Sequence, residues 1–295
     1  GQILIAVFGG LMLIEGKMTP GVFQAFFQYV NQVGEPITEM SYMLNSMQSA
    51  LASVERVYEF LDEKELVSDV ENKMTLTDVK GNVGFQNVRF GYSQDKILMQ
   101  DISFQAKAGQ KIAIVGSTGA GKTTIINLLM RFYEINAGNI TLDGICTQDM
   151  TRTELRSHFG MVLQDTWLFE GTIADNVGYA EEGMNKNKIV AAAKSACAHN
   201  FIKTLPNGYD MELSKGAENI SQGERQLLTI ARAIASDPEI MILDEATSNV
   251  DTHTEVLIQR AMAQLMKGRT SFVIAHRLST IRDADMILYM EDGSI

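Results

Sequence analysis

The sequence predicts an α/β fold with a parallel sheet, preceded by a long helical region. Residues 111–128 read KIAIVGSTGAGKTTIINL, in which an apolar strand runs into a glycine-rich loop and then into a helix. Three more short apolar runs end in polar side chains: GMVLQ at Gln164, EIMILDE at Asp244 and Glu245, and TSFVIAH at His276. Ligands of parallel sheets bind at the carboxyl ends of strands, so these four ends are expected at one site.

The bulk composition is that of a folded protein with one large or two modest domains. The chain has 295 residues, of which 45% are hydrophobic and 21% charged, and its formal net charge is −11. An acidic total argues against nucleic acid as a partner. The two cysteines, Cys146 and Cys197, are far apart and are expected to be free thiols, and with four scattered histidines they predict no metal cage.

The first part of the chain has helical patterning. Residues 3–14 carry no charge, but twelve residues are too few to cross a bilayer, which takes about 20. They are either a core helix or the end of a truncated membrane span. Residues 22–30 are mostly apolar and aromatic. Polar residues recur at steps of four, three and four, which places them on one face of a helix: Gln24, Gln28, Asn31 and Glu35. This polar stripe fits a membrane helix beside a wet cavity and, about equally, an ordinary amphipathic helix.

The helix is expected to continue to about residue 61 and to pack along another helix. Apolar positions alternate in steps of four and three at Met40, Leu44, Met47, Leu51, Val54, Tyr58 and Leu61. Met40, Met43 and Met47 form a methionine-rich patch, which fits core filling better than an adaptable surface for varied ligands. Residues 62–82 are largely charged without strong periodicity, which predicts a linker. From Val83 the runs alternate like strands, so a second, mixed α/β domain is expected over 83–295.

The glycine-rich loop fits the phosphate-binding pattern GxxxxGK[ST]. Gly119 and Gly121 let backbone N–H groups close around phosphate oxygens at a helix N-terminus. Lys122 is expected to reach the β and γ phosphates, while Thr123 ligates Mg²⁺ and Thr124 contacts a phosphate oxygen. The predicted phosphate-binding residues are Gly116, Ser117, Thr118, Gly119, Ala120, Gly121, Lys122, Thr123 and Thr124.

The polar strand ends predict hydrolysis of the bound nucleotide. Asp244 is expected to hold Mg²⁺ through water, and Glu245, one residue further, to act on the water that attacks the γ phosphate. Gln164 can bridge Mg²⁺ and that water, and His276 can donate to the γ phosphate. Phosphoryl transfer asks mainly for such positioning and charge neutralisation.

A second short segment, ISQGE at residues 220–224, precedes a helix-like run. Ser221 and Glu224 stand three apart in the pattern of a helix-capping box, yet the segment has no catalytic set. Together with the phosphate loop and the strand ends, it resembles the signature motif of ABC transporters of the exporter type. The resemblance implies that Ser221 and Gly223 face the γ phosphate of ATP bound to an opposite domain.

Further positions extend the resemblance over essentially the whole chain. Tyr92 stands where the family has an aromatic residue that stacks on adenine. The segment SNVD, which ends at Asp251, resembles the D-loop that crosses the dimer interface, and WLFEGTIADNV, from Trp167, resembles the helical subdomain that contacts the membrane domain. Gln164 and His276 fall at the Q-loop and H-loop positions.

The resemblance also implies a domain organisation. Residues 83–295 would form an ABC ATPase domain with a P-loop NTPase fold: a RecA-like core, an antiparallel β subdomain and a helical subdomain. Residues 1–61 would be the end of an α-helical transmembrane domain, with residues 3–14 closing its fifth span and residues 21–60 holding the sixth and its cytoplasmic extension. Residues 62–82 would link the two, and the chain would stop before the short C-terminal segment usual in such domains.

The activity implied is ATP hydrolysis with Mg²⁺, coupled to export of a drug, lipid or peptide-like substrate across the cell membrane, with the nucleotide-binding domain in the cytoplasm. An alternative is a soluble ABC-type ATPase that acts on DNA or the ribosome, since it would carry the same ATP motifs. The charge-free run, the polar stripe and the heptad pattern of the first 60 residues are expected only of the transporter.

Some positions depart from the commonest form of the family. The signature has Ile220, Gln222 and Glu224 where Leu, Gly and Gln are most common, and the D-loop has Asn249 and Val250 in place of Ala and Leu. Similar variants occur in exporters built from two different half-transporters. The resemblance therefore favours a different half-transporter, over a second copy of this chain, as the partner.

Overall fold

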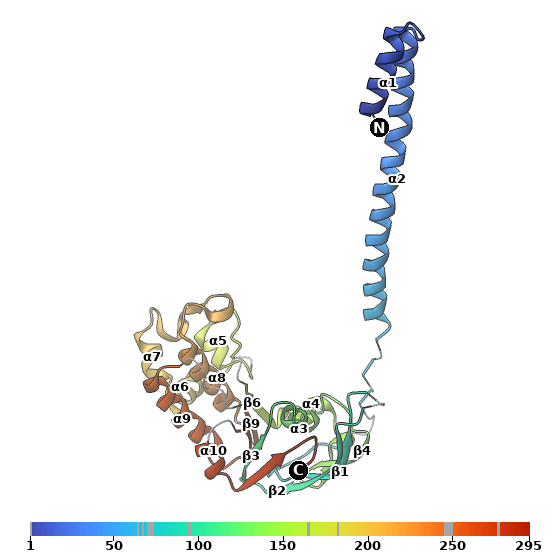
Figure 1. Ribbon diagram of the computed structural model, residues 1–295. Coiled ribbons are helices and arrows are strands. Elements are labelled where there is room, and N and C mark those ends of the chain that lie inside the picture. Colours follow the sequence, from blue (N-terminus) through green and yellow to red (C-terminus); the bar gives the residue numbers. More distant parts are fainter. Residues whose placement is uncertain are drawn as a thin grey trace. The chain divides into compact units, whose positions relative to one another are not determined.

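The computed structural model describes residues 2–63, 65–66, 68–69, 74–93, 96–163, 166–181, 183–244, 250–275 and 278–295. The chain divides into two compact units, Gly1–Val67 and Ser68–Ile295. The first unit is helical and the second contains the sheets (Figure 1). The boundary between them falls inside the predicted linker.

The first unit consists of two helices, α1 (Gln2–Ile14) and α2 (Pro20–Leu61). Thr19 caps the start of α2, where its hydroxyl accepts a hydrogen bond from the Val22 N–H, and a proline suits the first helical position. The α1 helix lies beside the first part of α2 (Figure 1). A Cβ at Gly9 would lie 2.3 Å from the Phe23 ring, so glycine there lets the helices approach.

The predicted long helix is present, and its surface is exposed. The polar residues Gln24 and Gln28 are exposed, and so are the heptad positions from Met40 to Leu61. Packing of those positions along another helix therefore stays a prediction. Among the described residues, no helix is both long enough and apolar enough to cross a membrane. The assignment of residues 3–14 and 21–60 to membrane spans likewise stays a prediction.

The larger sheet of the second unit has five parallel strands in the order β11–β3–β10–β9–β6. Their bounds are β3 Lys111–Gly116, β6 Phe159–Val162, β9 Ile240–Asp244, β10 Thr270–Ile274 and β11 Met286–Met290. All of β10 is buried, as expected for a parallel strand covered on both faces. The four apolar runs predicted to share a parallel sheet are β3, β6, β9 and β10, and they are neighbours in it, which confirms this part of the fold.

The smaller sheet is antiparallel, in the order β2–β1–β4–β5. Its bounds are β1 Val83–Phe90, β2 Met99–Ala106, β4 Ala137–Leu142 and β5 Ile145–Cys146. Phe85 and Val88, on either side of an irregularity in β1, are both buried in a core that also takes in α3 (Lys122–Leu129), the helix after the glycine-rich loop. This sheet is the antiparallel β subdomain expected from the sequence.

A group of helices surrounds a second core. The short strands β7 (Gly171–Thr172) and β8 (Glu212–Leu213) pair beside it. The helices of this core are α5 Ile173–Val177, α6 Lys186–Ser195, α7 His199–Thr204, α8 Gln222–Ser236 and α9 Thr252–Met266. Two further helices are α4 Arg152–Ser157, whose Leu155 belongs to the other core, and α10 Leu278–Arg282. The run WLFEGTIADNV leads into α5, whose start has a capping box made by Thr172 and Asp175. The helical subdomain is therefore present at the expected place.

Part of the predicted linker is bound to the second unit. Asp69 accepts hydrogen bonds from the backbone N–H of Arg152 (3.2 Å) and from its guanidinium (3.0 Å), and it lies 3.5 Å from the buried Arg131. Further along, the Asp143 carboxylate accepts three backbone N–H bonds from residues 80–82. Burial raises the pKa of Asp143, but these hydrogen bonds outweigh it and the net direction is downward.

Candidate nucleotide-binding site

The glycine-rich loop joins the end of β3 to the start of α3. At Gly116 (φ 150°) an added Cβ would lie 2.2 Å from the carbonyl oxygen of Met290 on β11, so a side chain does not fit. Gly121 is left-handed (φ 103°) and caps α3 without any side-chain hydrogen bond to the helix. The first N–H groups of α3 therefore remain available for an anion at the positive end of the helix dipole.

The Lys122 ammonium lies over the loop. Its Nζ donates hydrogen bonds to the carbonyl oxygens of Gly116 (2.9 Å) and Ser117 (2.8 Å). An ammonium has three donors, so one remains for a phosphate oxygen. The positive charge is thus fixed beside the open N-terminus of α3, which suits a polyphosphate group.

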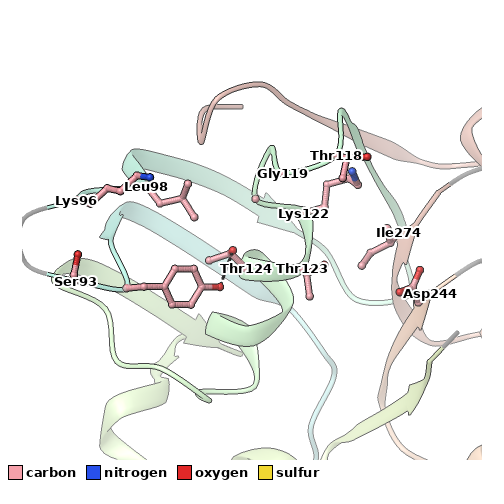
Figure 2. Close-up of a pocket in the computed structure, with 12 residues that line it drawn as sticks. Ser93, Lys96, Leu98, Thr118, Gly119, Lys122, Thr123, Thr124, Asp244 and Ile274 are labelled. Carbon is pink, nitrogen blue, oxygen red and sulfur yellow. Dashed lines mark hydrogen bonds between the residues drawn. The ribbon is translucent and has the colours of Figure 1, made fainter. Parts of the chain in front are cut away.

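A cavity of about 560 Å³ opens beside this loop. It is lined by Tyr92, Ser93, Lys96, Leu98, Thr118, Gly119, Gly121, Lys122, Thr123, Thr124, Asp244 and Ile274. In Figure 2, Ser93, Lys96 and Leu98 lie at one end of the cavity and Asp244 and Ile274 at the other. Its volume is in the range of small-molecule sites. The structure therefore brings together residues predicted separately for the base, the phosphates and the metal.

Tyr92 follows β1 and is fixed at one end of the cavity. Its hydroxyl lies 3.0 Å from the Thr124 Oγ1 on the first turn of α3. The ring packs edge-on with Phe90, at 5.0 Å between centroids, and its exposed fraction is 55%. An aromatic ring held in place yet half exposed is a suitable platform for a flat base.

The pair Thr123 and Asp244 fits a magnesium ion. Thr123 is the second residue of α3 and Asp244 the last of β9, and both line the cavity. Mg²⁺ prefers oxygen ligands, and it usually takes one or two protein oxygens together with water and phosphate. The other predicted catalytic residues, Gln164, Glu245 and His276, lie outside the described residues. The strands that precede them, β6, β9 and β10, end at the same edge of the sheet.

Four further residues of the cavity wall were not predicted: Ser93, Lys96, Leu98 and Ile274. Three of them belong to the connection between β1 and β2, which follows Tyr92, and Ile274 ends β10 shortly before His276. Proximity to those two predicted residues is the only sequence signal for them. Three predicted residues of the loop, Gly116, Ser117 and Ala120, do not line the cavity.

The signature residues lie away from the cavity lining in the described part of the chain. Ser221 caps α8: its hydroxyl and N–H both donate to the Glu224 carboxylate, each at 2.8 Å, which confirms the predicted capping box. Gly223 is buried, and a Cβ there would lie 2.3 Å from the Thr254 Cγ2 on α9. Close packing against its own domain is therefore one reason for glycine at this position.

Asp251 caps the start of α9. Its carboxylate accepts hydrogen bonds from the N–H groups of His253 (3.1 Å) and Thr254 (3.0 Å). Hydrogen bonds from the backbone and the side chain of Thr254 lower the pKa of Asp251. The carboxylate thus has a local role in the helix, and its predicted role at a dimer interface stays a prediction.

Fold and site together define a nucleotide-binding P-loop domain. The family model of ABC transporters matches residues 99–248. The chain therefore belongs to the ABC transporter family, whose ATPase domains bind ATP, generally with Mg²⁺.

Curated relatives match over the full chain. A "Fatty acid ABC transporter ATP-binding/permease protein" of Mycobacterium bovis (strain ATCC BAA-935 / AF2122/97) is 50% identical over 100% of this chain and 46% of that protein. An "ATP-dependent lipid A-core flippase" of Syntrophus aciditrophicus (strain SB) is 39% identical, over 100% of this chain and 49% of that protein. The chain thus spans about half the length of these relatives.

A solved structure also matches almost the whole chain. The "Structure of a bacterial Atm1-family ABC exporter with ATP bound" superposes with a TM-score of 0.74 at 37% sequence identity. The match covers 99% of this chain and 52% of that one. Because it takes in almost the whole chain, it includes the N-terminal helices as well as the ATPase fold.

Proposed function

We propose that the whole protein is an ABC exporter subunit that couples ATP hydrolysis to export of a substrate across the cell membrane. The observation that carries the proposal is the cavity in which Lys122, Thr123 and Asp244 meet at the carboxyl edge of a parallel sheet, with Tyr92 at its far end. The named relatives and the solved exporter support it, because they match the helical first unit as well as the ATPase fold.

Each residue of the site has a proposed part in hydrolysis. The Lys122 ammonium and the N–H groups of α3 hold the β and γ phosphates and offset their charge. Thr123 and Asp244 hold Mg²⁺, directly and through water, and the ion neutralises charge that develops on the phosphates. Glu245 and Gln164 orient the attacking water.

His276 completes the proposed set as a donor to the γ phosphate. It follows β10, whose last residue, Ile274, is part of the cavity wall. The position of β10 between β3 and β9 supports this role, because the loops after all three strands leave the same edge of the sheet.

The partner is proposed to be a different half-transporter. Ser221 and Gly223 would face the γ phosphate bound by that partner, and Asp251 would lie near the interface. The support is the set of departures at Ile220, Gln222 and Glu224, since an asymmetric pair can tolerate one altered signature. Purification of the tagged chain from its native membranes is expected to recover a second, different ABC subunit, and recovery of a fully active homodimer would contradict this.

The exported substrate is proposed to be an amphipathic molecule such as a lipid, with drugs and peptide-like compounds as further candidates. Two named relatives handle a fatty acid and a lipid. The first unit agrees with this, because α2 exposes a methionine-rich apolar surface together with its polar stripe. On this proposal the first unit is the end of a multi-pass membrane domain, in contact with membrane lipid.

The test is ATPase and transport by the full-length protein with its partner in lipid vesicles. Lys122→Ala removes the ammonium that lies over the phosphate loop, so ATP binding and ATP-dependent transport should both be lost. Lys107→Ala removes a lysine outside the cavity and serves as the matched control, with both activities retained. ATPase activity that is stimulated by DNA or ribosomes and moves no lipid would favour the soluble alternative.

A further inference from the structure

Three aromatic rings meet beside the nucleotide cavity. Tyr92 contacts Phe90 at 5.0 Å between centroids and 79° between planes, and Tyr133 at 5.0 Å and 89°. Phe90 and Tyr133 also contact each other at 5.9 Å. Tyr133 does not itself line the cavity. Its contact with the site therefore runs through Tyr92.

Tyr133 stands on a rigid support. The carbonyl oxygen of Arg131 accepts a hydrogen bond from the Arg156 guanidinium (3.0 Å), and the Phe132 N–H donates to the Asn127 carbonyl (2.8 Å). The Arg131 side chain is 6% exposed and donates hydrogen bonds to the backbone carbonyls of residues 147 and 150. These bonds fix the short segment after α3 from which the Tyr133 ring projects.

Tyr92 has less support of its own. It lies just past the end of β1 and is 55% exposed, while Phe90 is 2% exposed and fixed in the core. Its hydroxyl bonds to Thr124, at the start of α3, and its ring packs against Tyr133, just past the end of that helix. These two contacts hold the Tyr92 ring at both ends of α3, the helix that begins at the phosphate loop.

We propose that Tyr133 is a positioning residue that holds the Tyr92 ring in the orientation needed to stack on the adenine base. The inference rests on the proposed function only in that the cavity binds ATP. A ring fixed before the ligand arrives loses little conformational entropy on binding, so affinity is higher than with a ring free to rotate. Tyr133 thereby contributes to base binding without touching the nucleotide.

The test compares two ligands in the full-length protein with its partner: ATP, and inorganic tripolyphosphate, which has no base. Edge-to-face pairs contribute about 0.5–1.5 kcal/mol, so Tyr133→Ala should raise the Kd and KM for ATP about 2- to 13-fold. The kcat at saturating ATP and the Kd for tripolyphosphate should stay at the wild-type values. Tyr133→Phe keeps the ring and should behave as wild type, and Tyr133→Leu, which keeps bulk without the ring, should resemble the alanine variant.

A double-mutant cycle gives the sharper result. If Tyr133 acts through Tyr92, then Tyr133→Ala should change nothing further in a Tyr92→Ala background. The proposal is overturned by additive losses, by a matching loss of tripolyphosphate affinity, or by unchanged ATP affinity in Tyr133→Ala. Absence of ATP binding by the wild-type protein would instead overturn the proposed function, and this inference with it.

Discussion

Gly223→Ala tests how α8, the helix that begins at the signature segment, packs within its own domain. The added Cβ would lie 2.3 Å from the Thr254 Cγ2 and 3.2 Å from the Val250 Cγ1, and contacts under 3.0 Å are essentially never observed. Gly223 lies within α8 and outside the left-handed region, so the cost of the substitution is one of packing. The Thr254 side chain is β-branched and hydrogen-bonded to Asp251, so rotating its methyl group away would break that bond.

The magnitude follows from two opposing terms. Overpacking of a well-packed site costs about 1–3 kcal/mol, and the stiff neighbours place Gly223→Ala in the upper part of that range. Alanine has a helix propensity better than that of glycine by about 1 kcal/mol, which offsets part of the loss. The expected net destabilisation is about 1–2 kcal/mol, or a fall in melting temperature of roughly 2–8 °C for a domain of this size.

Thermal unfolding of the full-length protein in lipid, followed by circular dichroism, measures the effect. Thr254→Ser removes Cγ2, so the pair Gly223→Ala/Thr254→Ser should recover most of the lost stability, while Thr254→Ser alone shows the cost of the deleted methyl. Gly34→Ala, where an added Cβ meets nothing within 4 Å, controls for the exchange itself and should not lower the melting temperature. A Gly223→Ala variant as stable as wild type would refute the packing argument.

Three further predictions concern the base, the buried charges and pH. Tyr92→Ala should weaken ATP binding by roughly 1–3 kcal/mol with little change in kcat at saturation, while Tyr92→Phe, which keeps the ring, should lose much less in an equilibrium binding assay. Arg131→Met removes a buried guanidinium that donates hydrogen bonds to the carbonyls of residues 147 and 150, while Arg152 still pairs with Asp69 and Glu134, so chemical denaturation should show a loss of about 1–3 kcal/mol. The pKa of Asp143 in the folded protein lies below its usual 3.8. The contribution of its carboxylate to folding stability is therefore complete above that pH and is lost as the pH falls through the folded-state pKa. In acid denaturation, the stability difference between wild type and Asp143→Asn should shrink below about pH 4.

Features set by local pattern were predictable from the sequence. The apolar runs form β3, β6, β9 and β10. Each run is short, apolar and followed by a glycine-rich or polar segment, which is the pattern of a buried parallel strand. The capping box at Ser221 formed because both of its partners lie within one turn of helix. The loop from Gly116 followed from the strand before it and the helix after it.

Features set by contacts distant in sequence were not predictable. Asp69 lies in a charged run without periodicity, and such a run looks the same whether its carboxylates are solvated or, as here, held by arginines far along the chain. Lys96 and Leu98 line the cavity, and no local pattern in the sequence between β1 and β2 indicates that. The contact of Gly223 with Thr254 depends on how α8 packs on α9, which no spacing in either helix encodes.

The measurement that tests the account most directly compares Glu245→Gln with Asp244→Asn in the full-length protein with its partner. Glu245→Gln leaves Lys122, Thr123 and Asp244 intact, so Mg²⁺ and ATP should bind as in wild type, while hydrolysis at this site falls by about 100-fold or more. Asp244→Asn removes a carboxylate of the cavity wall, so Mg²⁺-dependent ATP binding should weaken first. Hydrolysis at the wild-type rate by Glu245→Gln at this site would contradict the account.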